Sequence, residues 1–174
     1  MLEPEATVVR AAAAGDAAAF EQVVRATLGP LRRYLRHLVG DAALADDLAQ
    51  DVLVKVHAQL HTYRFESRFL TWVFRIARNA ALDDRRADTR RRRREERAAV
   101  VAAATDPEVA GEVAFAIASL PTELREPLLL LEICGFTYAE VGELLRIPEG
   151  TAKSRVHRAR EGVARWYALP RRSR

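Results

Sequence analysis

The sequence is short of several features that define whole classes of proteins. It has a single cysteine, Cys134, so no disulfide can form within the chain. No apolar run approaches the roughly 20 residues that a membrane-spanning helix needs. The start of the chain lacks a basic segment before an apolar one, so we expect no secretion signal. These absences argue against disulfide-stabilised and membrane-spanning proteins and favour the reducing environment of the cytoplasm.

Strand signals are nearly absent as well. Ala-rich, Arg-rich and Leu-rich segments repeat with a period near 3.6 residues, whereas alternating β-branched runs are missing. The pattern predicts an all-α fold with helix interruptions or kinks at Gly29 and Pro30. The expected helices of the first half cover residues 4–14, 16–28, 31–39, 41–60 and 67–86.

A basic run, Arg90 to Arg94, marks a change in composition in the middle of the chain. Dense like charge disfavours a compact fold, so this run is either a frayed helical extension or a flexible arm. We therefore expect two small helical domains joined by a flexible linker. The predicted boundaries are 1–87 for the first domain, 88–106 for the linker, 107–169 for the second domain and 170–174 for a tail.

Residues 137–161 predict a helix-turn-helix, whose second helix enters the major groove of DNA. Thr137 and Glu140 have the spacing of a capping box, and Pro148 and Gly150 break the chain before the second helix. The alternative is a solvated cationic helix on an all-helical protein. The candidate DNA-binding residues are Thr151, Lys153, Ser154, Arg155, His157, Arg158 and Arg160.

A second pattern lies within the expected helix 41–60. At 100° per residue, Asp47, Gln50, Asp51 and Val54 fall on the face opposite the apolar stripe. An acidic strip with an apolar centre suits a partner that is basic with an apolar pocket. The alternative is an ordinary solvated face, because single exposed apolar residues are common.

A third pattern combines aromatic residues with arginines in and just before residues 67–86. Arginine holds phosphates, aromatic rings stack on unpaired bases, and asparagine reads a base edge. The structural alternative is strongest for Phe69 and Phe74, which more often belong to a core. The candidate single-strand-binding residues are Tyr63, Phe65, Thr71, Trp72, Arg75, Arg78 and Asn79.

Taken together, these segments resemble a bacterial RNA polymerase sigma factor of the extracytoplasmic-function (ECF) type. DLAQDVLVKVH resembles the polymerase-binding part of sigma region 2. RFLTWVFRIARNAALD resembles the part that melts and reads the minus-10 promoter element. LPTELREPLLLLEICGFTYAEVGELLRIPEGTAKSRVHRARE resembles region 4, which reads the minus-35 element.

The resemblance implies roles for the matched residues. Asp47, Gln50 and Asp51 correspond to the strip that grips the clamp of the large polymerase subunit, and region 4 would meet the flap. Asn79 corresponds to a residue near the loop that captures a flipped base, and the second helix of the helix-turn-helix to the minus-35 reader. The linker would run toward the RNA exit path, and an anti-sigma factor is the expected regulator.

The chain departs from the family pattern at three positions. Asp84 stands where basic or apolar residues are more usual, and Asp51 replaces the commoner Glu. Glu149 would repel a phosphate unless it caps the helix or accepts a hydrogen bond from a cytosine amino group.

Two other functions compete with this interpretation. A stand-alone helix-turn-helix regulator would leave the strip at 47–54 and the Trp72 segment without a role. An enzyme would need a catalytic group, and His57 and His61 lack the glutamate that follows the first histidine of a zinc protease helix. We therefore expect no catalytic residue, no metal and no cofactor.

Overall fold

The computed structural model describes residues 3–95 and 112–168, and the side chains of residues 3–84 and 115–168. Within these ranges all regular structure is helical. The chain divides into two compact units, Met1–Ala104 and Thr105–Arg174. The predicted all-α fold with two helical bodies is therefore confirmed. Among the described residues, no helix combines the length and apolarity that crossing a bilayer demands.

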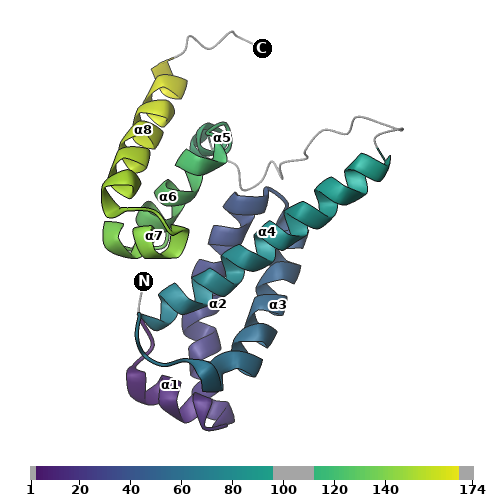
Figure 1. Ribbon diagram of the computed structural model, residues 1–174, viewed down its shortest axis with the longest axis vertical. Helices are drawn as coiled ribbons and strands as arrows, with labels where there is room; N and C mark the ends of the chain where they lie inside the picture. Colours follow the sequence, from purple (N-terminus) through teal and green to yellow (C-terminus); the bar gives the residue numbers. More distant parts are fainter. Residues whose placement is uncertain (1–2, 96–111, 169–174) are drawn as a thin grey trace. The chain divides into compact units, whose positions relative to one another are not determined.

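The first unit is a small helical bundle. Helices α2, α3 and α4 lie side by side, and α1 lies across one end of the bundle (Figure 1). Tyr34, Phe69 and Phe74 are the largest of the side chains buried between them. Its elements are α1 (Ala6–Ala13), α2 (Ala17–Val39), α3 (Ala42–Gln59), the 3₁₀ turn η1 (Leu60–Thr62) and α4 (Phe69–Glu95).

Local chemistry sets the helix ends of this unit. The Asp16 carboxylate accepts hydrogen bonds from the backbone N–H groups two and three residues on, at 2.8 and 3.0 Å. Asp41 does the same for Leu44 N at 2.9 Å. Such a cap stabilises a helix by about 1 kcal/mol. Gly40 ends α2 with φ of 80°, a conformation that costs glycine little.

The sequence predicts an interruption or a kink at Gly29 and Pro30, and helix α2 runs through both residues without an interruption. An interior proline costs a helix about 3 kcal/mol, since it removes one backbone hydrogen bond and crowds the preceding turn. Leu31, Tyr34 and Leu35 directly follow and are completely buried. Burial of large apolar side chains is worth about 1.5–3 kcal/mol each, which offsets the cost and keeps the helix continuous.

Helix α4 is longer than predicted, because it continues to Glu95 where we expected an end near residue 86. Residues 88–95 of the predicted linker are thus helical, which favours the helical extension over the flexible arm. Arginine has a high intrinsic helix propensity. The rest of the predicted linker, 96–106, and the predicted tail, 170–174, lie outside the described residues.

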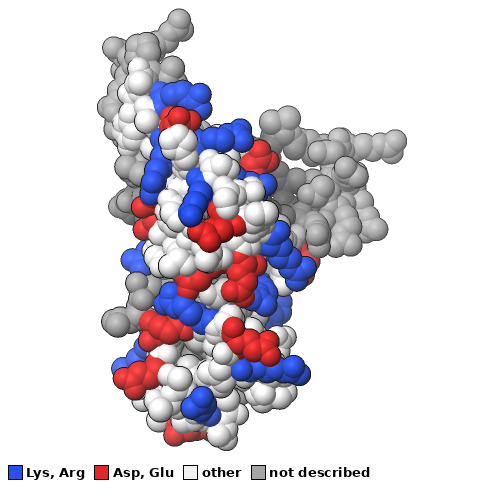
Figure 2. All heavy atoms as spheres, turned by 60° about the vertical axis from the view of Figure 1, so that its left-hand side comes forward, with Lys and Arg blue, Asp and Glu red and all other residues white. Residues whose placement is uncertain are grey.

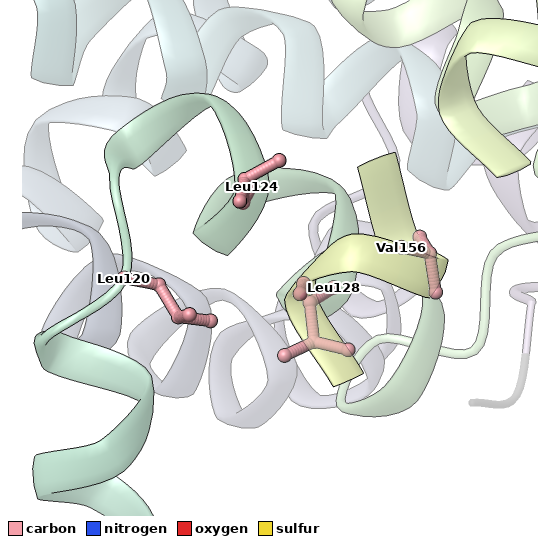
Figure 3. Packing of buried hydrophobic residues seen from close by; sticks show 5 residues of the cluster. Leu120, Leu124, Leu128 and Val156 are labelled. Carbon is pink, nitrogen blue, oxygen red and sulfur yellow. The ribbon is translucent and has the colours of Figure 1, made fainter. Parts of the chain in front are cut away.

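The second unit is held together by a leucine cluster. Leu120, Leu124 and Leu128 pack against Val156 and Ala159, so α6 is joined to α8 (Figure 3). The single cysteine, Cys134, is also buried, as its apolar neighbours in the sequence predict. The helices of this unit are α5 (Glu112–Ala118), α6 (Thr122–Glu132), α7 (Tyr138–Leu145) and α8 (Glu149–Ala168).

The connection between α7 and α8 is a tight turn. The predicted capping box of Thr137 and Glu140 is present at the start of α7. At its end the N–H of Ile147 donates to the carbonyl of Gly142 at 2.9 Å. A Cβ atom on Gly142 would lie 2.8 Å from the backbone oxygen of Ile147, closer than real contacts allow. Glycine at this position therefore permits the close approach that sets α7 against α8.

Candidate functional surfaces

The acidic strip on α3 consists of Asp47, Gln50, Asp51 and Val54, and all four side chains are exposed. Val54 is the most exposed of the large apolar side chains that the structure describes, at 69% of its surface. On the opposite face of the helix, Leu48, Val52 and Val56 are buried, as the helical period predicts. The structure thus gathers the predicted residues on one open face.

The carboxylates of the acidic strip are available to a partner. Asp47 and Asp51 make no ion pair or hydrogen bond with any other residue that the structure describes. Like charges four residues apart repel by a few tenths of a kcal/mol, so a cation between them would be stabilising. The strip therefore offers two carboxylates around an exposed apolar group, which fits a basic surface with an apolar pocket.

An aromatic cluster, formed by Tyr63, Phe65, Phe69 and Trp72, lies at the start of α4. The Tyr63 ring centroid is 4.6 Å from that of Phe65, 5.4 Å from that of Phe69 and 5.4 Å from that of Trp72. Phe69 is buried, as a core residue, whereas Phe65 is 38% exposed and Tyr63 and Trp72 are half-buried. The cluster therefore presents aromatic surface anchored on a buried ring, which suits stacking on a base.

Burial also affects the chemistry of this cluster. It raises the pKa of the Tyr63 phenol above its ordinary value of 10.0, and the nearby Glu3 carboxylate raises it further. The Tyr63 hydroxyl donates a hydrogen bond to the backbone oxygen of Ser67 at 2.5 Å. Tyr63 is therefore neutral at physiological pH and serves as a hydrogen-bonded ring.

Thr71 is a correction to the predicted DNA-binding set. Its side chain is completely buried, and its hydroxyl has no hydrogen-bond partner among the described residues. Helix α4 is enclosed on a wide face by α2 and α3, so residues beside the apolar stripe are covered too. Of the other candidates on α4, Asn79 is exposed, and Arg75 and Arg78 are half-buried. Thr71 cannot reach DNA in this conformation.

The candidate residues of the helix-turn-helix all lie on α8. Val156 and Ala159 are buried against α6, and α8 also packs against α5 and α7, so only part of its circumference is turned outward. Thr151 and Arg155 are half-buried. The exposed candidates are Lys153, Ser154, His157, Arg158 and Arg160.

Two candidate residues of α8, Lys153 and His157, each lie beside a carboxylate of the same helix. Lys153 Nζ lies 2.7 Å from Glu149 Oε1, and His157 Nε2 lies 3.4 Å from Glu161 Oε1. The hydrogen bond and charge of Glu149 raise the pKa of Lys153 above 10.5, so this lysine is charged. Both pairs span four residues, a spacing visible in the sequence that our prediction of DNA-binding residues did not use.

Arg160 makes a longer-range contact. Its Nε lies 3.0 Å from Glu132 Oε1 at the end of α6, so this arginine links two helices of the unit. Arg155 and Arg158, in contrast, make no ion pair with any residue that the structure describes. The face drawn in Figure 2 likewise shows Lys and Arg side chains interspersed with Asp and Glu. Arg155 and Arg158 are thus the cations of this set without such a partner.

His57 and His61 are both exposed, and the His57 ring packs edge-on against Phe20 with 4.7 Å between ring centroids. The described residues contain no group of three or more His, Cys, Asp or Glu side chains arranged for a metal. His57 therefore has a packing role at the end of α3.

Comparisons with known proteins agree with this arrangement. The sequence profile of Sigma-70 region 2 matches residues 23–92, and that of Sigma-70 region 4 matches residues 110–161. These matches cover the acidic strip, the aromatic cluster and the helix-turn-helix.

Individual relatives cover most of the chain. The ECF RNA polymerase sigma factor SigM of Mycobacterium tuberculosis is 34% identical over 92% of this chain and 83% of its own. EcfG of Rhodopseudomonas palustris, also an ECF RNA polymerase sigma factor, is 35% identical over 81% of each chain. The sigma factor RpoE of Bartonella quintana, solved with the anti-sigma factor NepR, has a TM-score of 0.77 at 27% identity. That match covers 87% of this chain and 98% of RpoE. The chain belongs to the extracytoplasmic-function family of RNA polymerase sigma factors.

Proposed function

We propose that this chain binds core RNA polymerase through the acidic strip and directs it to promoters through the aromatic cluster and α8. The observation that carries the proposal is the pairing, in one chain, of an exposed carboxylate strip around Val54 with a helix-turn-helix in a separate unit. A stand-alone DNA-binding regulator would not need the exposed carboxylate strip. The family match to both sigma regions supports the same conclusion.

For polymerase binding, the proposed contact is the clamp of the large subunit. Asp47 and Asp51 would pair with its cations while Val54 enters an apolar pocket. Because these carboxylates have no internal partner among the described residues, binding breaks no ion pair of the free protein. Charge complementarity of this kind mainly sets partner choice and the rate of association.

For the minus-10 element, the proposed contacts are the exposed ring of Phe65 and the half-buried rings of Tyr63 and Trp72. Unstacking a base costs a few kcal/mol, and stacking on an aromatic ring returns about 1–3 kcal/mol per base. Asn79 is exposed and can read a base edge, whereas Arg75 and Arg78 can hold phosphates from half-buried positions. No chemical step and no cofactor is required for this melting.

For the minus-35 element, the proposed reader is the N-terminal half of α8, docked in the major groove. Arg155 and Arg158 are the first choices for phosphate or guanine contacts, since neither is held by a described carboxylate. Lys153 and His157 must exchange their carboxylate partners for DNA. The second unit would also meet the flap of the polymerase.

We further propose that an anti-sigma factor holds this protein inactive, in the cytoplasm where it meets polymerase. The related RpoE of Bartonella quintana was solved bound to its anti-sigma factor NepR. The exposed Val54 is a natural target for such an inhibitor, because covering it also covers the polymerase-binding carboxylates.

Transcription in vitro tests the proposal. The purified chain and core polymerase are incubated with a pool of double-stranded genomic promoters, and the RNA products are sequenced. We expect discrete start sites that share an upstream element and that disappear without the chain. A pull-down with core polymerase separates the sigma factor from a stand-alone regulator, which binds DNA but not the enzyme. Absence of any transcript from all templates, with no inhibitor present, would refute the proposal.

A further inference from the structure

The N-terminal segment, residues 3–10, contacts the loop of residues 63–67, which carries Tyr63 and Phe65 of the aromatic cluster, and the start of α4. Glu3 Oε1 accepts a hydrogen bond from the backbone N–H of Leu70, in the first turn of α4, at 3.3 Å. Its other carboxylate oxygen lies 3.1 Å from an Arg68 guanidinium nitrogen. Glu3 therefore satisfies an unpaired backbone donor at the start of α4, where the helix dipole also favours a negative charge.

A second contact of this segment reaches Phe65. The guanidinium carbon of Arg10, on α1, lies 4.8 Å from the centroid of the Phe65 ring, within the range of a cation–π interaction. Phe65 has a φ of 60°, a left-handed conformation that is unusual for a bulky residue. Such a conformation persists only where the surroundings hold it, and the Arg10 contact is one such restraint.

The loop is restrained from within as well. The Tyr63 hydroxyl bonds to the Ser67 backbone oxygen, which closes residues 63–67 into a compact turn. The rings of Tyr63 and Phe65 meet inside that turn with 4.6 Å between their centroids. Glu3 contacts the chain where the loop joins α4, and Arg10 contacts Phe65 in the middle of the loop. The N-terminal segment therefore restrains the loop at two points.

We propose that Arg10 and Glu3 are positioning residues for promoter melting, which hold Phe65 and Tyr63 ready to stack on an unpaired base. The inference rests on the proposed function, because it concerns the ligand of the aromatic cluster. Arg10 acts through Phe65, and Glu3 acts through Arg68 and the first turn of α4. A loop that is ordered before binding loses less entropy when the base arrives.

The recognised ligand is a single unpaired base of the minus-10 strand, stacked on the exposed part of the Phe65 ring. A cation over an aromatic ring also contributes to single-strand binding in general. Removing Arg10 should therefore weaken capture of that base while leaving polymerase binding and the minus-35 contact intact.

The test is a double-mutant cycle between Arg10 and the base, carried out with the complete chain and core polymerase. An abasic sugar is placed in turn at each minus-10 position of a promoter identified by transcription. Open complexes are then measured by permanganate reactivity of unpaired thymines. For the wild type, we expect one position at which losing the base reduces open complexes about tenfold.

Arg10→Ala should reduce open complexes on the intact promoter about fivefold. At the sensitive position it should shrink the abasic penalty from about tenfold to about twofold, because most of the stabilisation of that base is already lost. Arg10→Lys keeps a cation over Phe65 and should retain most of the wild-type sensitivity. Arg25→Ala is the matched control, since Arg25 is an exposed arginine of the same unit that pairs with Glu21 on α2.

Glu3 provides an independent variant. Glu3→Gln keeps an acceptor for the Leu70 N–H and should lose less than Glu3→Ala, which removes both the acceptor and the charge. Thermal melting of each variant shows whether the unit remains folded. If Arg10→Ala and Glu3→Ala fold and keep the full wild-type abasic penalty, the positioning role is wrong. If the wild type initiates transcription but no abasic position reduces its open complexes, the proposed capture of a base by Phe65 is wrong. A wild type that never initiates transcription would instead refute the proposed function.

Discussion

The acidic strip of α3 and the cationic face of α8 are opposite in more than the sign of their charge. The carboxylates Asp47 and Asp51 have no partner among the described residues, and they flank an exposed Val54. On α8, by contrast, Lys153 is paired with a carboxylate of its own helix, and Arg160 is paired with one on α6. The proposed polymerase-binding surface has no partner among the described residues, whereas the proposed DNA-binding surface is partly neutralised by its own unit.

This difference has a physical consequence for binding order. A partner that meets the strip gains its full electrostatic attraction at once, which speeds association. DNA must displace Glu149 from Lys153 before that lysine can contact a phosphate, so the free chain should bind DNA weakly. Polymerase binding before promoter binding is the order that the charges favour.

The largest effect is expected from reversing the strip. Asp47→Arg combined with Asp51→Arg should weaken core polymerase binding roughly a hundredfold, because like charges then face each other across the interface. Glu21→Arg is the control, since Glu21 is an exposed carboxylate of the same unit on α2. Binding is measured by the fluorescence of labelled core polymerase. Unchanged affinity in the double variant would mean that the strip is not the polymerase contact.

The next effect compares the first part of α8, which is the proposed DNA reader, with its last part. Arg158→Ala should weaken promoter binding about tenfold. It should also reduce the slope of log affinity against log salt concentration by roughly one, as expected for a lost phosphate contact. Arg165→Ala, on the last part of the same helix, should have little effect. Fluorescence anisotropy over a range of salt concentrations measures both. Equal losses in the two variants would show that α8 binds DNA through general charge alone.

A gain of binding is expected when the internal neutralisation is removed. Glu149→Gln frees Lys153 and deletes a charge that repels phosphate, so affinity for random-sequence DNA should rise about two- to threefold. Glu123→Gln, on α6, should not change it. The competing possibility is that Glu149 accepts from a cytosine amino group. In that case, the variant would lose affinity for one promoter base and gain nothing on random DNA.

The smallest effect concerns alkaline pH and belongs to the first unit. Burial and Glu3 hold the pKa of Tyr63 above 10.0 in the folded chain. Neutral Tyr63 therefore contributes stability that is complete below pH 10 and is lost as the pH rises through the raised folded pKa. Glu3→Gln should lower the pKa of Tyr63 without returning it to the ordinary value, because burial is the larger cause. Carbon-13 NMR of labelled tyrosine rings measures the pKa. An unaltered pKa in the variant would show that the Glu3 carboxylate does not act on the Tyr63 phenol.

How well the sequence predicted these features depends on the range of the interactions involved. The capping box of Thr137 and Glu140 involves residues three positions apart, so the sequence predicted it and the structure confirms it. Val156 and Ala159 stand at helical spacing in the sequence, and this periodicity alone indicates the buried face of α8.

Predictions that depended on distant packing were less successful. Thr71 is buried because α4 is enclosed more widely than one apolar stripe indicates. The helix α2 continues past Pro30 because tertiary burial outweighs a local cost. The contacts of Glu3 with Leu70 and of Arg160 with Glu132 join residues 67 and 28 positions apart, and no local pattern reveals them.

The buried Cys134 makes this protein convenient to study with thiol reagents. It is the only cysteine of the chain and lies in the second unit with 1% of its surface exposed. The rate at which a thiol reagent modifies Cys134 will therefore report how often the second unit opens. Under native conditions, a thiol-reactive fluorophore will label a cysteine introduced at an exposed site long before it reacts with Cys134.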